Sequence, residues 1–148
     1  MIFYFDDPNN VDKLVQALKD WHGTPWMFNA RVKGQGADCS NYVAGVLIDC
    51  GARGKIIVPP HPNWYFIHKE DNRLLDGIIN LGVEENNSSP NDGDLIMFKV
   101  GKSIAHIGIY YNKHIYHSLY KLGTSIISWN SRPWQRRKRF VFRLKDRT

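Results

Sequence analysis

The sequence predicts an α+β fold in which N-terminal helices pack on a C-terminal antiparallel sheet. Helical apolar patterns come first along the 148 residues and strand patterns follow, an order typical of α+β domains. The strand patterns are separated by short turns, which favours antiparallel pairing. The length suits one domain, and no internal repeat or linker-like segment is visible. We therefore predict a single domain over residues 1–148.

Two helices are expected before the middle of the chain. Apolar residues at helical spacing over residues 11–18 form the first stripe, and Gly23 ends that pattern. A second stripe covers residues 43–50. Asp38 is a favourable N-cap for it, so Cys39 is expected at the first helical position.

The second half of the chain continues with one more helix and then with strands. After a proline-rich break, a third helix is predicted over residues 63–80, with these side chains facing inward: Trp64, Ile67, Leu74, Leu75 and Ile78. Residues 84–91 are polar and turn-rich, so we expect a surface loop there. About five strands are then predicted, over residues 94–100, 106–111, 114–120, 125–129 and 139–144.

Two of these strands are expected to bring two histidines together. Residues 112–113 suit a two-residue hairpin loop, which sets Gly108 opposite His117. Side chains alternate between the faces of a strand, so His106 and His117 become diagonal neighbours on one face. The glycine between them keeps that space open. His114 falls on the opposite face.

Cys39 has the surroundings of a nucleophile. Unpaired N–H groups and the positive end of a helix dipole favour the thiolate at a helix start. His106 is the candidate general base, and His117 is the group that orients it. The same residues also allow plainer interpretations: a small core thiol, two half-buried strand histidines, or a three-ligand zinc site. Cys50 lies on the apolar face of its helix and is expected to be a buried structural thiol.

Four short motifs occur in a characteristic order: Asp-Cys-Ser at 38–40, Gly-Asp-Leu-Ile-Met-Phe at 93–98, His-Ile-Gly-Ile-Tyr at 106–110 and Tyr-His-Ser at 116–118. In these motifs the chain resembles the NlpC/P60 family of cysteine peptidases, which cleave peptide stems of bacterial cell walls. Three further segments resemble the small cell-wall peptidases of tailed phages and gene transfer agents: Gly-Thr-Pro-Trp at 23–26, Lys-Gly-Gln-Gly at 33–36 and the basic stretch at 134–137.

The resemblance implies a papain-like fold and an endopeptidase that cleaves peptidoglycan stem peptides through a thioester acyl-enzyme. It assigns catalysis to Cys39, His106 and His117, and it implies no cofactor and no metal. Phage tail components are possible partners. Two rival functions stay open: an amidase or acyltransferase with the same triad, and a catalytically idle phage structural or nucleic-acid-binding protein.

The resemblance also implies three residues that contact the substrate: Trp26, Asp38 and Ser40. Trp26 stands where the family usually has a tyrosine whose hydroxyl helps to bind the stem peptide. An indole N–H can donate to a developing oxyanion but cannot accept from a substrate amine. A core position for Trp26 is the alternative. A second departure is Asn41, which stands where the family usually has glycine.

Positive charge is concentrated at the C-terminal end. The formal net charge is +6, but residues 132–148 carry +7 and residues 1–131 carry −1. Attraction to anionic cell wall, docking to an acidic tail partner, nucleic-acid binding and a solvated strand face all suit such a segment. Nucleic-acid binding is the serious alternative function, but the segment has no recognised nucleic-acid motif, and Phe140, Phe142 and Leu144 alternate as in a core strand, so we do not expect nucleic acid as a partner.

Residues 1–8 lack the basic and apolar regions of a signal peptide, and no apolar run is long enough to span a membrane. We therefore expect synthesis in the cytoplasm without membrane insertion. The phage-type resemblance then implies that a virion or host lysis carries the protein to the cell wall.

Overall fold

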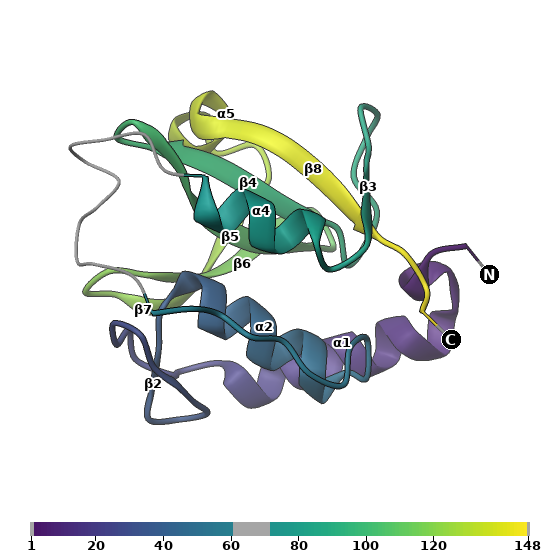
Figure 1. Ribbon diagram of the computed structural model, residues 1–148, viewed down its shortest axis with the longest axis horizontal. Coiled ribbons are helices and arrows are strands. Elements are labelled where there is room, and N and C mark those ends of the chain that lie inside the picture. The colour runs from purple at the N-terminus through teal and green to yellow at the C-terminus, as the bar shows by residue number, and fades with distance from the viewer. Residues whose placement is uncertain (1, 61–71, 148) are drawn as a thin grey trace.

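A computed structural model describes residues 2–60 and 72–147, with helices α1 and α2 stacked beneath a twisted sheet (Figure 1). A single-turn helix, η1 (Tyr4–Asp6), precedes α1 (Pro8–Trp21). Asp7 caps α1 by accepting a hydrogen bond from the Asn9 N–H at 2.9 Å, and proline at the first helical position suits this start. The predicted stripe is confirmed, and the helix ends two residues before Gly23.

Helix α2 (Cys39–Asp49) begins at the predicted residue with Asp38 as its N-cap. It packs against α1 so closely that a Cβ on Gly45 would lie 2.2 Å from the Trp21 ring. The Trp21 indole N–H also donates to the Asp49 carboxylate at 2.8 Å. Before α2, two short strands that the sequence analysis missed, β1 (Arg31–Val32) and β2 (Gly36–Ala37), form a separate ribbon.

The third helix was predicted over residues 63–80, but it begins only at Arg73, because Asn72 before it has non-helical backbone angles, and residues 63–71 lie outside the described residues. Helix α4 (Arg73–Ile79) ends as expected, and Ile78 is buried in the core with Leu74 and Leu75 packed at its edge. Trp64 and Ile67 lie outside the described residues. The buried guanidinium of Arg53 donates to the carbonyl of Leu81, 2.7 Å from Nη2, and so fixes the turn after α4.

The main sheet has six antiparallel strands in the order β3-β8-β4-β5-β6-β7. Their bounds are Val83–Glu85 for β3, Leu95–Val100 for β4, Ser103–Tyr111 for β5, His114–Leu119 for β6, Gly123–Ser128 for β7 and Lys138–Leu144 for β8. In this main sheet, β3 is the strand that the sequence analysis did not predict, and its last two residues fall in the expected loop 84–91. Both are exposed glutamates, and only pairing with distant β8 makes this segment a strand.

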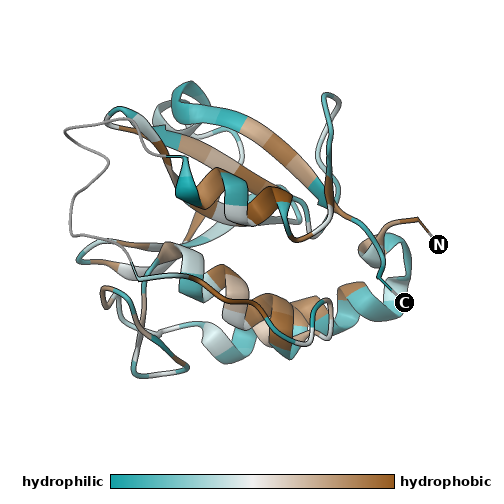
Figure 2. Cartoon of the chain, viewed as in Figure 1, coloured by the Kyte–Doolittle hydropathy of each residue, from teal (hydrophilic) through white to brown (hydrophobic). Residues whose placement is uncertain are grey.

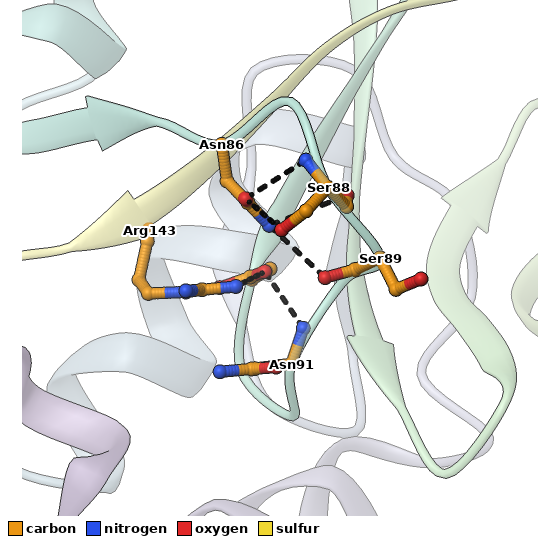
Figure 3. Close-up of polar contacts among 6 residues, drawn as sticks. Asn86, Ser88, Ser89, Asn91 and Arg143 are labelled. Carbon is orange, nitrogen blue, oxygen red and sulfur yellow. Dashed lines mark hydrogen bonds and ion pairs between the residues drawn. The ribbon is translucent and has the colours of Figure 1, made fainter.

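The polar segment after β3 is ordered by its own side chains. Asn86 accepts hydrogen bonds from the backbone and hydroxyl of Ser88, and its amide donates to the carbonyl of Ser89 (Figure 3). The buried Asp94 carboxylate then pairs with both Nε and Nη2 of Arg143, each at 3.0 Å. This ion pair joins β8 to the start of β4 and is part of the Gly-Asp-Leu motif.

The hairpin between β5 and β6 has the predicted register. Tyr111 pairs with His114, and residues 112–113 both have positive φ, as a type I′ turn requires. A Cβ on Gly108 would lie 3.2 Å from the Cβ of His117, so glycine is needed beside that histidine.

Both faces of the sheet are covered. The main core lies between the sheet and helices α1 and α2, whose inward residues are strongly apolar (Figure 2). A second, smaller core on the other face contains Ile96, Phe98, Tyr110, Ile115 and Val141, with Trp129 and Trp134 packed against it. Trp134 comes from α5 (Arg132–Arg137), a short helix that the sequence analysis did not predict. No helix in the described ranges is long and apolar enough to cross a bilayer.

Candidate active site

The start of α2 is held by a dense set of hydrogen bonds to Asp38. One oxygen of this buried carboxylate accepts from the backbone N–H and the side-chain amide of Asn41, at 3.1 and 3.0 Å. The other accepts from the Asn29 N–H at 2.8 Å. Asn41 in turn accepts from Arg31 Nε at 3.0 Å. A glycine at position 41 would lack both of these side-chain hydrogen bonds.

The segments that lead to Cys39 are tied to the edge of the sheet. The hydroxyl of Ser118 on β6 donates to the Ala37 carbonyl at 2.8 Å. The Thr124 N–H on β7 donates to the Thr24 carbonyl at 3.1 Å. Gly123 has a φ of +75°, and a Cβ there would lie 2.9 Å from that same carbonyl oxygen. These contacts place the Gly-Thr-Pro-Trp segment and the cysteine on the side of the sheet where β6 and β7 meet.

The Cys39 thiol contacts a β-bulge in β5. Phe98 pairs with His106 but Lys99 pairs with Ile104, which leaves Ala105 as an extra residue in β5. The Cys39 thiol donates to the carbonyl of Ala105, with sulfur and oxygen 3.8 Å apart. Bulges redirect neighbouring side chains, and this one lies directly before the candidate base.

His106 and His117 form the close pair that the strand alternation predicts. Nε2 of His106 and Nδ1 of His117 are 2.8 Å apart, and their ring centroids are 4.9 Å apart. His117 is completely buried and His106 is 7% exposed. His114 lies on the exposed side of the hairpin and hydrogen-bonds to the Asn112 carbonyl.

Burial keeps both imidazoles of this pair neutral at rest. It lowers the pKa of His117 to about 4. The pKa of His106 lies well below its usual 6.5, mainly because of burial and also because His117 and the cation of Arg137 disfavour a second charge. Neutral rings carry one N–H each, so one histidine must donate to the other across the 2.8 Å contact.

The fold favours the protonated form of the Cys39 thiol, although the place of this residue at a helix start favours the thiolate. Burial and the nearby Asp38 carboxylate raise its pKa to about 12. Backbone N–H groups lower the pKa, those of Ser40 and Cys39 at the helix start as predicted and that of Ile107 from β5, but they do not outweigh burial. Cys39 as a whole residue is half-buried.

Cys39 and His106 line one cavity of about 750 Å³. In the described ranges, no hydrogen bond joins the thiol to the imidazole; the thiol bonds to Ala105 instead. The same cavity wall contains all three predicted substrate contacts: Trp26, Asp38 and Ser40. Trp26 belongs to neither hydrophobic core, so the alternative of a core position is wrong. Its ring contacts those of Phe28 and Tyr120, at centroid distances of 6.1 and 4.9 Å.

Trp134 is the site residue that sequence reasoning missed. Its ring centroid lies 5.0 Å from those of His106, His117 and Phe98, so it covers the histidine pair. The Arg137 guanidinium lies 5.1 Å from the same ring. The only signal in the sequence was an aromatic residue within the basic stretch, and nothing local placed it over the sheet.

Two further expectations concern the cysteines and metals. Cys50 is fully buried, as predicted, and burial raises its pKa to about 11. Across residues 2–60 and 72–147, no group of three or more histidine, cysteine or acidic side chains is placed to hold a metal ion.

Comparison with known proteins identifies a family. The model of the NlpC/P60 family matches residues 23–143. An NLP/P60-family protein from Staphylococcus aureus, described as similar to a lipoprotein, has a similar fold, with a TM-score of 0.64 and 21% identity over 93% of this chain and 42% of its own. The NlpC/P60 domain of the peptidoglycan hydrolase SagA aligns with a TM-score of 0.58 and 16% identity, over 88% of this chain and 96% of that domain.

A third similar structure is the peptidoglycan hydrolase RipB from Mycobacterium tuberculosis, with a TM-score of 0.59 and 15% identity over 95% of this chain and 67% of its own. The chain therefore spans less than half of the staphylococcal protein but nearly all of the SagA domain. A comparison with curated protein sequences finds no match.

Proposed function

The chain belongs to the NlpC/P60 family, and we propose that it is a cell-wall hydrolase that cleaves an amide bond in peptidoglycan stem peptides with Cys39 as nucleophile. The observation that carries this proposal is the buried His106–His117 pair on the wall of the cavity that Cys39 also lines. The substrate class is supported by SagA and RipB, both described as peptidoglycan hydrolases.

The first half of the reaction forms a thioester. Nδ1 of His106 takes the proton of the Cys39 thiol while the sulfur attacks the scissile carbonyl carbon. His106 then carries a positive charge, which His117 stabilises by accepting the Nε2–H at the 2.8 Å contact. The tetrahedral intermediate collapses as the imidazolium gives its proton to the leaving amine, and the carbon–nitrogen bond breaks.

The second half releases the enzyme. A water molecule gives a proton to His106 and attacks the thioester carbon, and the sulfur leaves and recovers its proton. The Cys39 backbone N–H and the Trp26 indole N–H are the proposed donors to the oxyanion in both halves. Burial favours a neutral thiol and a neutral imidazole as the resting partners.

The phage or gene-transfer-agent subtype remains part of this proposal. It rests on the Gly-Thr-Pro-Trp, Lys-Gly-Gln-Gly and basic segments of the sequence. With it comes the proposed route to the cell wall, in a virion or by host lysis, and the possible contact with phage tail components.

Purified peptidoglycan and mass spectrometry test the function. We expect new muropeptides whose masses differ by one water across a single stem amide, and none after incubation with the Cys39→Ala variant. The Cys50→Ala variant is the matched control, because it removes a buried thiol away from the cavity. Products extended by an added amine instead of water would indicate an acyltransferase. No product with the wild-type protein would overturn the hydrolase proposal.

A further inference from the structure

One nitrogen of the buried histidine pair has no hydrogen-bonding partner. In the described parts of the chain, Nε2 of His117 is the buried side-chain nitrogen or oxygen that lacks any partner. An unpaired polar atom in an apolar surrounding costs about 1–3 kcal/mol, so such an atom needs an explanation.

The pair has two possible arrangements of its protons. If His106 donates from Nε2, then its Nδ1 is bare and His117 carries its own proton on the unpartnered Nε2. If His117 donates from Nδ1 instead, its Nε2 is bare and His106 carries a proton on Nδ1. Only the first arrangement leaves Nδ1 of His106 able to accept a proton from a thiol. Something must therefore favour an N–H rather than a lone pair at the unpartnered nitrogen.

The Trp134 ring has the position and chemistry to do this. The planes of His117 and Trp134 meet at 74° with centroids 5.0 Å apart, so one ring presents its edge to the other. The π face of an indole is negative and accepts N–H groups, whereas it repels a nitrogen lone pair. Contacts with Phe98 and Arg137 hold the indole in this place.

We propose that Trp134 is a positioning residue whose ring accepts the Nε2–H of His117 and so fixes the tautomer that leaves Nδ1 of His106 free to act as base. The inference rests on the proposed function for its catalytic meaning. The tautomer itself is independent of any activity.

Two substitutions separate this role from simple packing. Trp134→Phe keeps an aromatic face, and Trp134→Leu keeps apolar bulk but has no π electrons. If Trp134 only fills space, the two variants should behave alike. If its ring selects the tautomer, phenylalanine should preserve the wild-type state and leucine should not.

The experiment reads the tautomer directly by long-range ¹⁵N–¹H spectra of the imidazoles at neutral pH, with turnover of a stem peptide measured in parallel. We expect His117 protonated at Nε2 in the wild type and in Trp134→Phe. In Trp134→Leu we expect a mixture of tautomers and about two- to fivefold slower turnover, the effect of losing one weak hydrogen bond.

A wild-type His117 protonated at Nδ1, or an unchanged tautomer in Trp134→Leu, would overturn the inference. If Trp134→Leu does not fold, Trp134→Met, which also keeps apolar bulk without π electrons, takes its place in the comparison. If no variant and no wild type hydrolyses the peptide, the peptidase proposal fails while the spectra still report the tautomer. Normal hydrolysis with the opposite tautomer would reject the role of Trp134 alone.

Discussion

The two halves of the candidate active site are built differently. Cys39 sits on a helix start whose position comes from hydrogen bonds, chiefly to Asp38, and the residue is half-buried. His106 and His117 sit on sheet strands, buried among aromatic rings, with one hydrogen bond between them. Substitution of Cys39 should therefore remove the reacting thiol without changing the fold. Substitutions around His106 should also change the packing and the protonation of the histidine pair.

The largest expected effect is at the nucleophile. Cys39→Ala should abolish turnover without loss of fold, because the loop is held by other residues. Cys50→Ala should keep activity but lose about 1 kcal/mol of unfolding free energy, since that thiol is fully buried. Peptide hydrolysis and urea unfolding measure the two quantities. Hydrolysis at the wild-type rate by Cys39→Ala would end the cysteine mechanism.

Substitution of His106, the proposed base, should give the next largest loss of turnover. His106→Ala should slow turnover at least ~10²-fold, the usual lower limit for lost acid–base catalysis. His114→Ala is the matched control from the same hairpin, because that histidine is exposed on the other face. Steady-state kinetics at neutral pH compare them. Equal and mild losses would mean that the histidine pair does not act in catalysis.

The buried His117 should make the fold sensitive to acid. Its pKa falls from 6.5 in the unfolded chain to about 4 in the folded protein, so the unfolded state binds more protons between these values. The contribution of His117 to stability is present above pH 6.5 and is lost as pH decreases toward 4, by about 2 kcal/mol at pH 5, and the lowered pKa of His106 gives a further loss of the same sign.

His117→Asn keeps a polar group without this titration. Its unfolding free energy should therefore change less between pH 7 and pH 5 than that of the wild type. It should also retain more activity than His117→Ala, because the amide can still accept from His106. Urea unfolding at both pH values tests the first expectation. The same loss in wild type and His117→Asn would show that other groups cause the acid sensitivity.

A smaller effect is expected on the cysteine side. Asn41→Gly restores the usual family residue and removes the two side-chain hydrogen bonds to Asp38 and Arg31. We expect a loss of about 1–2 kcal/mol of unfolding free energy, with turnover within about threefold of wild type. Thermal unfolding and kinetics on one sample measure both. A large loss of turnover with unchanged stability would mean that Asn41 contributes to catalysis rather than to the loop.

The smallest expected effect on activity comes from the basic residues of α5, the helix whose Trp134 covers the histidine pair. Arg137 and Lys138 stack on Trp134 and Trp129, so they are left in place, and the exposed Arg132 and Arg136 are changed to Gln. Activity on intact sacculi should fall about two- to fivefold at low salt, because two charges that attract anionic wall are lost. Turnover of a small soluble muropeptide should stay constant. Equal losses on both substrates would point to a structural role, and lost DNA retention alone would favour nucleic-acid binding.

Local signals were sufficient for several parts of this site. The N-cap at Asp38 placed Cys39 at a helix start, and the two-residue turn at 112–113 set the strand register. Strand alternation then put His106 and His117 on one face, where they meet. Each of these features depends on residues close together in sequence, where backbone geometry and capping leave few alternatives.

Other parts were decided by contacts between distant segments. Strand β3 exists because β8 pairs with it, and the bulge at Ala105 appears only in the pairing with β4. Trp134 covers the histidines because α5 folds back over the second core, and burial there keeps both rings neutral. The sequence by itself determined which groups can react. The tertiary structure decided how these groups are protonated and which side chains cover them. Burial and pairing between distant segments produce no periodic pattern in the local sequence, so they could not be predicted from it.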